Sequence, residues 1–248
     1  MVGQIERYLL DKIHEDGAIH ITLIDPEKTT PQMASHIAHE AGSAGTAGIM
    51  VGGSTITSTS RLDGVVKAIK KAVKIPVILF PNNITGISKY ADAIWFMSLL
   101  NSSDPYFLTG AQVLGAPIIR KFGLEAIPLG YIIVGEGGTV GVIGRACPIP
   151  YNKPELAAAY ALAAQYFGMR FVYLEAGSGA KQPVPSDMIK MVKDLVSVHV
   201  VVGGGIRTSQ QVKEMVSAGA DILVTGTVIE ECKVREKIRE LVEGIRSK

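Results

Sequence analysis

Short, nearly continuous apolar runs alternate along this chain with stretches in which apolar residues recur every three or four positions. An uninterrupted apolar run predicts a parallel strand that is covered on its outer face, and the second spacing predicts a helix with one apolar side. The helical spacing is clear over 62–73, 212–219 and 234–245, and an additional amphipathic helix is predicted over 5–13. The predicted strands are 18–25, 47–53, 76–81, 93–101, 125–134, 171–177, 198–204 and 222–226.

The order of these elements predicts the fold. Eight strand-then-helix units in 248 residues are typical of a (β/α)8 barrel, or TIM barrel. A doubly wound open sheet is the alternative, but no Gly-x-Gly-x-x-Gly follows the first strand. No linker divides the chain, so we expect residues 1–248 to form one domain, with the 5–13 helix closing the lower end of the barrel. The longest break in the pattern, 135–151, is a candidate lid.

Composition narrows the possible functions. The chain is 47% hydrophobic and 19% charged, and its net charge of +2 is too small to indicate a nucleic-acid-binding protein. The two cysteines, Cys147 and Cys232, lack a metal-binding spacing and suit a reducing compartment. The N-terminus does not resemble a signal peptide, and no apolar run reaches the roughly 18 residues of a membrane span. We therefore expect a cytoplasmic protein without stable membrane insertion.

Glycines follow the last three predicted strands, at the edge of the barrel where active sites lie. The seventh and eighth strands lead into Gly203-Gly204-Gly205 and Gly226-Thr227, and the sixth leads into Gly177-Ser178-Gly179. Bare backbone N–H groups near the start of a helix bind phosphate, so these loops predict a phosphate site. Glycines that serve only tight turns are the alternative.

Asp25 ends the first predicted strand and faces a second glycine cluster, Gly52-Gly53-Ser54. Mg²⁺ typically takes only one or two carboxylates and fills its remaining positions with phosphate oxygens and water. Asp25, with the hydroxyl of Ser54 as a further ligand, therefore suits a metal-bound diphosphate. An aspartate that only caps the following turn is the alternative.

Glu175 ends the sixth predicted strand, beside the predicted phosphate site. If a phosphate-bearing alcohol occupies that site, its hydroxyl groups extend toward the barrel centre. There Glu175 can accept a proton from one of them as general base. The alternative is an internal ion pair of Glu175 with Lys181 or Arg207, because buried acids are rarely left unpaired.

At these residues the sequence resembles the geranylgeranylglyceryl phosphate synthase family and its bacterial heptaprenylglyceryl phosphate relatives. The matching stretches are "LIDPEK" (23–28), "VGGS" (51–54), "YLEAGSG" (173–179), "VGGGIR" (202–207) and "VTGT" (224–227). The resemblance implies a Mg²⁺-dependent prenyltransferase. The implied reaction moves a geranylgeranyl group from its diphosphate to the 3-hydroxyl of sn-glycerol 1-phosphate. This reaction forms the first ether bond of archaeal-type membrane phospholipids.

The resemblance also implies roles for single residues. Asp25 and Ser54 resemble the Mg²⁺ positions, and Glu175 resembles the proton acceptor. Thr227 departs from the asparagine expected in much of the family, but its backbone N–H and hydroxyl still suit phosphate binding. The implied glycerol phosphate site comprises Tyr173, Leu174, Glu175, Ala176, Gly177, Ser178, Gly179, Gly204, Gly205, Gly226 and Thr227.

A long prenyl tail needs an apolar trough, and its candidate residues precede the 135–151 loop that would cover it. They are Ile94, Trp95, Phe96, Pro105, Tyr106 and Phe107. The long loop and the region before it resemble the larger-oligomer branch of the family, so we expect a homo-oligomer. Other functions stay open: a phosphate-sugar isomerase or lyase that uses Asp25 and Glu175 as an acid–base pair, a binding barrel without catalysis, or the same reaction with another prenyl length.

Overall fold

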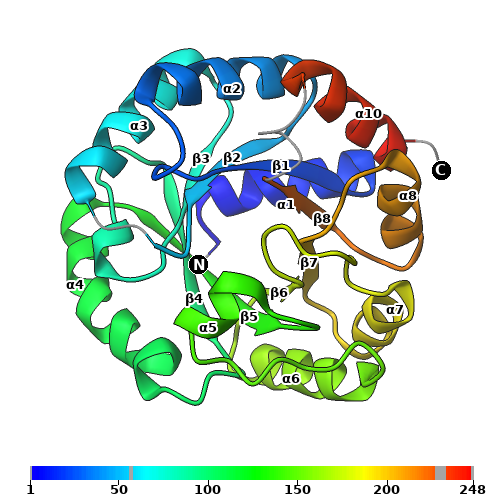
Figure 1. Ribbon diagram of the computed structural model, residues 1–248. Helices are drawn as coiled ribbons and strands as arrows, with labels where there is room; N and C mark the ends of the chain where they lie inside the picture. The colour runs from blue at the N-terminus through cyan, green and yellow to red at the C-terminus, as the bar shows by residue number, and fades with distance from the viewer. Residues whose placement is uncertain (1, 56–57, 227–232, 247–248) are drawn as a thin grey trace.

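The structure is a computed structural model that describes residues 2–55, 58–226 and 233–246. Eight parallel strands pair in chain order and close into a barrel, because β8 pairs with β1, and the helices surround this barrel (Figure 1). The predicted (β/α)8 fold is confirmed. The strands are β1 (Ile19–Ile24), β2 (Gly48–Gly52), β3 (Val77–Phe80), β4 (Ala93–Leu99), β5 (Glu125–Ile133), β6 (Phe171–Glu175), β7 (His199–Gly203) and β8 (Ile222–Thr225).

The helices follow the predicted spacing, with one addition. The 135–151 segment is not wholly irregular, because a short helix, α5, forms inside it. The α-helices are α1 (Gln4–Asp16), α2 (Pro31–Ser43), α3 (Thr59–Ala72), α4 (Ala111–Phe122), α5 (Gly138–Ile143), α6 (Pro154–Tyr166), α7 (Ser186–Leu195), α8 (Ser209–Ser217) and α10 (Val234–Arg246). A 3₁₀ turn, η1 (Ile84–Gly86), and a π-helical turn, η2 (Tyr106–Gly110), complete the set.

Alternation along the strands decides which side chains enter the barrel. Ile21, Trp95, Leu129 and Phe171 are buried together in the interior cluster. The residues between them, such as Ile49, point outward into the layer beneath the helices. Because the pattern repeats every second residue, the last inward positions of the strands reach the upper edge of the barrel together, and there they carry the chemistry-bearing side chains.

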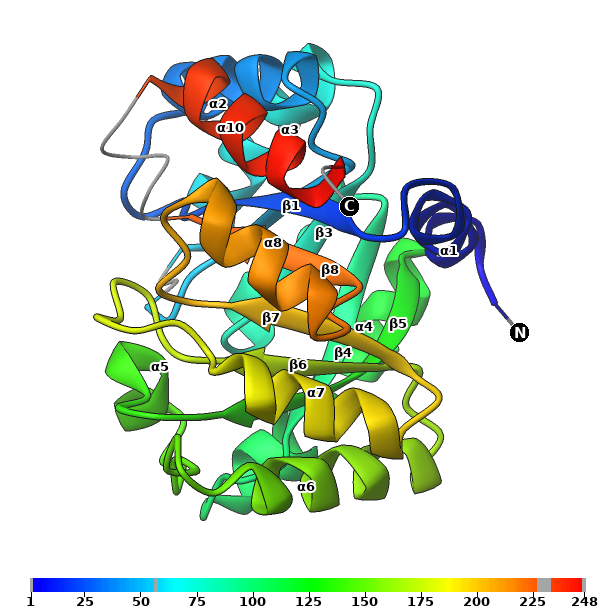
Figure 2. The same cartoon turned by 90° about the vertical axis from the view of Figure 1, so that its right-hand side faces the viewer.

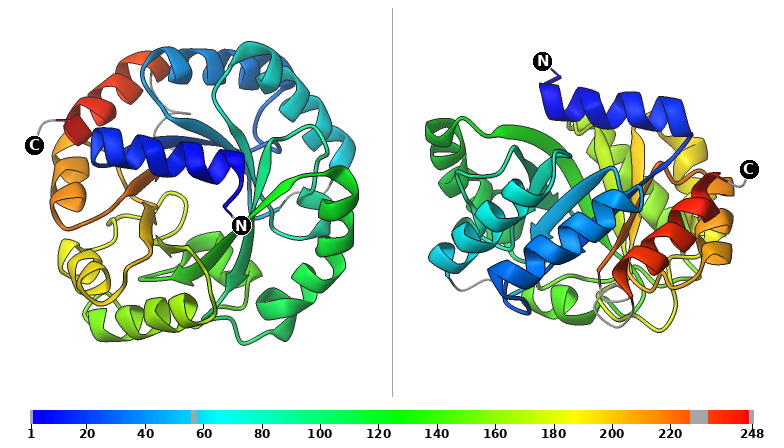
Figure 3. Two further views of the ribbon diagram at one scale, coloured as in Figure 1. Left: turned by 180° about the vertical axis from the view of Figure 1, so that it is seen from behind. Right: turned by 90° about the horizontal axis from the view of Figure 1, so that it is seen from above.

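The opposite end of the barrel is closed by α1, which lies across it in the view from behind (Figure 3) and far from α5 in the side view (Figure 2). The Glu125 carboxylate accepts the backbone N–H groups of Ile5 and Glu6 at 2.8 Å each, so it caps the first turn of α1. The buried Glu6 carboxylate then pairs with the guanidinium of Arg170. The barrel interior is therefore covered by α1 at this end. Among the described segments, no helix is long and apolar enough to cross a bilayer.

Candidate active site

Three cavities at the upper edge of the barrel join into one continuous site. The central cavity has a volume of about 1060 Å³ including its open mouth. It shares Glu175 and Ser178 with a smaller socket of about 550 Å³. It shares Ser54, Met97 and Tyr131 with an apolar pocket of about 730 Å³. A single molecule, or two molecules in contact, can therefore extend from the socket through the centre into the apolar pocket.

The smaller socket is built from the glycine loops that follow β6, β7 and β8. Ser178, Gly179, Gly204, Gly205 and Gly226 line it. Gly204 and Gly205 have φ angles of +84° and +72°, which strain residues that carry a side chain. A Cβ on Gly204 would also lie 2.6 Å from Glu175 Oε1. These glycines thus expose backbone at the socket wall, as a phosphate site requires. Thr227, also predicted to belong here, lies outside the described residues.

Glu175 lies at the junction of the socket and the central cavity and is only 6% exposed. Its Oε1 accepts the backbone N–H of Gly177 at 2.7 Å, and this bond holds the carboxylate at the cavity wall. In the described part of the chain Glu175 forms no ion pair with Lys181 or Arg207. The structure therefore does not support the ion-pair alternative there.

Burial raises the pKa of Glu175 above its usual 4.5, and the Gly177 N–H together with the hydroxyls of Tyr173 and Tyr131 only partly opposes this effect. Both tyrosines are buried, and burial together with the nearby carboxylate holds the pKa of each well above the usual 10. They consequently stay protonated. The Tyr173 hydroxyl interacts with the Glu175 carboxylate, and both residues line the socket. A carboxylate with a raised pKa beside a protonated tyrosine suits proton abstraction from an alcohol.

Asp25 lies across the central cavity, which Ser54 also lines. Its Oδ1 accepts the backbone N–H of Glu27 at 2.9 Å, so the carboxylate does cap the following turn, and it still lines the cavity. A Cβ on Gly53 would lie 2.6 Å from that oxygen, so only glycine lets the loop after β2 approach the carboxylate this closely. The turn cap that the sequence left as the alternative is therefore present, and metal binding by Asp25 stays a prediction.

The donor set at Asp25 fits Mg²⁺ better than a metal held by protein alone. Within the described residues there is no group of three or more His, Cys, Asp or Glu side chains that could hold a metal. Mg²⁺ needs no such group, because one carboxylate, a hydroxyl, waters and substrate phosphates satisfy its octahedral preference. Asp25 and Ser54 on one cavity wall would supply the carboxylate and the hydroxyl, and the open volume between them and Glu175 would hold a diphosphate.

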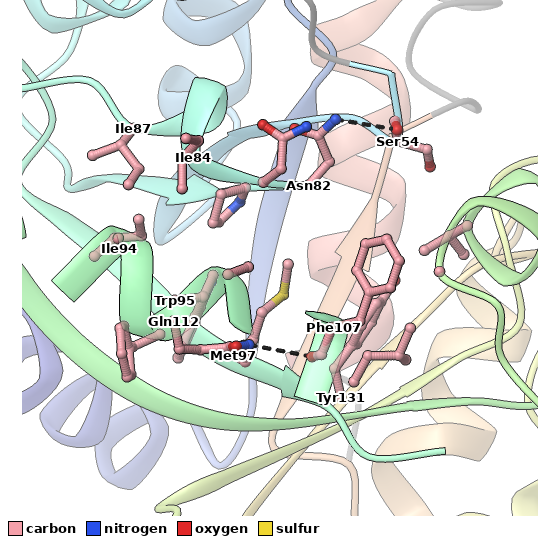
Figure 4. A pocket seen from close by; sticks show the side chains of 18 of the residues that line it. Ser54, Asn82, Ile84, Ile87, Ile94, Trp95, Met97, Phe107, Gln112 and Tyr131 are labelled. Carbon is pink, nitrogen blue, oxygen red and sulfur yellow. Dashed lines mark hydrogen bonds between the residues drawn. The ribbon is translucent and has the colours of Figure 1, made fainter. Parts of the chain in front are cut away.

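The apolar pocket extends from the central cavity between β3, β4, η1 and α4, and Figure 4 shows its side chains. Four of the six predicted trough residues line it, namely Ile94, Trp95, Phe96 and Phe107, whereas Pro105 and Tyr106 do not. Pro105 caps the η2 turn, and Tyr106 is its first residue. The sequence missed other walls of the pocket, which are Ile84, Ile87, Gln112, Gly115 and Tyr131.

The 135–151 segment lines this pocket and also contacts the loop after β6. Val140 and Ile143 of α5 line the apolar pocket. At the other end of the segment, a Cβ on Gly177 would lie 3.1 Å from the backbone of Gly137. Asn101, buried at the end of β4, fixes the segment by donating to the carbonyl of Cys147 at 2.9 Å. The lid expected from sequence thus forms part of the walls of the apolar pocket and, through Thr139 and Val140, of the central cavity.

The comparisons with known proteins agree with this geometry. The model of the PcrB family matches residues 11–245. Geranylgeranylglyceryl phosphate synthase from Thermofilum pendens is 56% identical over 99% of this chain and 96% of its own length, and the Pyrococcus abyssi enzyme is 55% identical over 99% and 97%. The chain belongs to the PcrB family, with the geranylgeranylglyceryl phosphate synthases. The family expected from the motifs is confirmed.

Solved structures of the family extend the match to three dimensions. The Thermoplasma acidophilum (S)-3-O-geranylgeranylglyceryl phosphate synthase, solved with its substrate sn-glycerol 1-phosphate, has a TM-score of 0.95, is 43% identical and covers 100% of both chains. The tryptophan synthase of Mycobacterium tuberculosis is only 15% identical with a TM-score of 0.64, so it shares the fold alone. The similarity to the solved synthase is therefore greater than a shared barrel fold alone would give.

Two cavity residues of this PcrB chain, Tyr131 and Asn82, were not predicted from the sequence. Tyr131 lines both the central cavity and the apolar pocket, yet in the sequence it is one residue within a long apolar strand. Asn82 lines the same two cavities, and its amide donates to the carbonyl of Ser54 at 3.3 Å (Figure 4). A rule that every second residue faces inward, applied to β3 and β5 and continued past their ends, would have found both.

Proposed function

We propose that this chain transfers a geranylgeranyl group from its diphosphate to the 3-hydroxyl of sn-glycerol 1-phosphate. The observation that carries the proposal is the continuity of the three cavities, because it places a phosphate socket, a carboxylate and a long apolar pocket along one path. Two relatives, which are 56% and 55% identical to this chain, are named geranylgeranylglyceryl phosphate synthase, and the similarity covers nearly their whole length.

The glycine loops hold the phosphate of the glycerol substrate, and the alcohol end then points toward Glu175. In the reaction the bond between the allylic carbon and the diphosphate oxygen breaks, and a bond between that carbon and the glycerol oxygen forms. Glu175 accepts the proton that the hydroxyl loses. Asp25 and Ser54 would hold Mg²⁺, which stabilises the negative charge that develops on the departing diphosphate. The cavity contributes further by holding the two substrates at reacting distance.

The apolar pocket takes the prenyl chain. Most of its walls are apolar residues, among them Ile, Phe, Trp and Met side chains, and Val140 and Ile143 of α5 also line it. Burial of a hydrocarbon chain there is favourable by about 0.8 kcal/mol for each CH₂ removed from water. This binding energy comes from a part of the substrate that does not react, and it places the diphosphate beside Asp25.

We further propose that the protein acts in the cytoplasm as a homo-oligomer. The outer side of α6 supports the oligomer, because Leu156, Tyr166 and Phe167 are 47%, 77% and 74% exposed there. Exposed apolar side chains that gather on one face indicate a protein interface. Light scattering coupled to size exclusion measures the mass in solution, and a monomer at all concentrations would contradict this part of the proposal.

The test of the reaction is an incubation of the purified protein with Mg²⁺, sn-glycerol 1-phosphate and a series of labelled prenyl diphosphates, with and without EDTA. The proposal expects an ether product that EDTA abolishes, with the geranylgeranyl diphosphate preferred. A different preferred length would keep the reaction and correct the substrate. A folded protein that binds glycerol phosphate and forms no product with any chain length would refute the proposal. Isomerisation of a sugar phosphate that is insensitive to EDTA would support the rival enzyme instead.

A further inference from the structure

Arg61, in the first turn of α3, contacts the loop that carries Asp25. Its Nε donates to the carbonyl of Pro26 at 2.7 Å. A second nitrogen of the guanidinium donates to the carbonyls of Glu27 at 2.9 Å and Thr29 at 3.3 Å. The Arg61 Nε also lies 3.7 Å from the Glu27 carboxylate. One side chain therefore binds three carbonyl groups of the turn formed by residues 26–29.

This contact is connected to the Asp25 carboxylate through one peptide unit. The peptide between Pro26 and Glu27 donates its N–H, that of Glu27, to Asp25 Oδ1 at 2.9 Å, while its carbonyl, that of Pro26, accepts from Arg61 Nε at 2.7 Å. The turn also closes on itself, since the N–H of Lys28 donates to the backbone carbonyl of Asp25 at 3.2 Å. A shift of the turn would therefore move the N–H that orients the carboxylate.

The helix itself does not explain an arginine at this place. The N-terminal end of a helix dipole is positive, so a cation in the first turn is disfavoured. The backbone of Arg61 is fixed there, because its N–H donates to the Ser58 side chain at 3.3 Å. The guanidinium consequently starts from a rigid position and reaches across to the turn with a planar set of donors, which is the geometry that suits several carbonyls at once.

We propose that Arg61 is a positioning residue that holds Asp25 in the orientation needed to bind Mg²⁺ and diphosphate. The inference rests on the proposed function, because it takes Asp25 as the metal-binding carboxylate. Arg61 acts through the 26–29 turn and does not touch the reacting atoms. Its loss would leave the glycerol phosphate socket intact, since that socket is built from the loops after β6, β7 and β8.

The experiment is calorimetric titration of inorganic pyrophosphate into the full-length protein at saturating Mg²⁺, and separately of sn-glycerol 1-phosphate. The variants are Arg61→Ala and Arg61→Lys. Lysine keeps the positive charge but is a point charge that cannot bind three carbonyls in this geometry. The matched control is Arg235→Ala, since Arg235 pairs with Glu40 at 2.9 Å and its side chain has the same 46% exposure as that of Arg61.

We expect Mg²⁺-dependent binding of pyrophosphate to weaken about tenfold in both Arg61 variants, which corresponds to about 1.4 kcal/mol. Binding of glycerol phosphate and the melting temperature should match those of the unsubstituted protein, and Arg235→Ala should change none of these quantities. Unchanged pyrophosphate binding in Arg61→Ala would overturn the inference. So would full restoration by lysine, because the charge alone would then suffice, or an equal loss of glycerol phosphate binding, because the effect would then be general.

Failure of the inference can be distinguished from failure of the proposed function. If the unsubstituted protein forms the ether product and binds pyrophosphate with Mg²⁺, and Arg61→Ala does both equally well, only the role of Arg61 is refuted. If the unsubstituted protein neither forms the product nor binds pyrophosphate with Mg²⁺, the proposed metal site at Asp25 is refuted, and the role of Arg61 is refuted with it.

Discussion

Replacement of Glu175 by glutamine tests the proposed general base with almost no change of shape. Oε1 of Glu175 already accepts the Gly177 N–H at 2.7 Å, and the glutamine carbonyl oxygen can keep that bond. The glutamine NH₂ group then occupies the position of the second oxygen, and it has no lone pair to accept a proton. General-base catalysis contributes roughly 10²–10⁴-fold, so we expect kcat to fall at least about a hundredfold, or about 2.7 kcal/mol of barrier.

The melting temperature of Glu175→Gln shows whether a loss of activity comes from lost catalysis or from a destabilised fold. Burial raises the pKa of Glu175 above its usual 4.5. A carboxyl group with a raised pKa in the folded state stabilises the fold most below its unfolded pKa, and this contribution is lost as the pH rises through the folded value. At neutral pH the ionised, buried Glu175 is therefore unfavourable, and glutamine removes that cost. The variant should melt at the same temperature as the unsubstituted protein or higher.

The assay measures labelled ether product extracted into organic solvent, under saturating Mg²⁺ and both substrates, with the melting temperature followed by calorimetry. For the unsubstituted protein, the acid side of the kcat/KM profile should fall at a pH above 4.5, because the raised pKa of Glu175 sets that limb. A Glu175→Gln variant that keeps kcat within about tenfold of the parent would refute the assignment of the base. A loss of activity that accompanies a lower melting temperature would refute the reasoning from burial.

Three further outcomes follow from the structure. Gly204→Ala should raise the KM for glycerol phosphate more than the control Gly168→Ala does. Both positions have left-handed φ (+84° and +82°), but only at Gly204 would the new Cβ clash with a carboxylate, that of Glu175. Steady-state kinetics of both variants measure the difference. Gly115→Leu should shift preference to shorter prenyl diphosphates, since Gly115 lines the apolar pocket, and a competition among chain lengths detects the shift. Burial raises the pKa of Asp221, but hydrogen bonds from His199, Lys193 and the backbone N–H of Val200 outweigh burial and leave the pKa below 3.8. Asp221→Asn should therefore lose stability above pH 3.8, and calorimetry should find this deficit shrinking as the pH falls below that value.

The sequence by itself determined the fold and the ends of the strands where the chemistry lies. Each strand is a local apolar run, each helix has its own period, and Asp25 and Glu175 follow their strands directly, so all of these signals lie within a few neighbouring residues. The phosphate site could be predicted for the same reason, because each glycine loop directly follows its strand. The expected trough was only partly right, because Phe107 lines the pocket whereas its chain neighbours Pro105 and Tyr106 do not.

Only the tertiary structure decided how these parts combine. Closure of the barrel brings Tyr131, Gln112 and Ile87 to one pocket, although they come from β5, α4 and the segment after η1. It also brings the guanidinium of Arg61 to the carbonyls beside Asp25, across 34 positions of sequence in the case of Glu27. The physical reason is that periodicity reports which face of an element is buried but not what packs against that face. Contacts between distant elements depend on the register and tilt of the closed sheet, which no short stretch of sequence encodes.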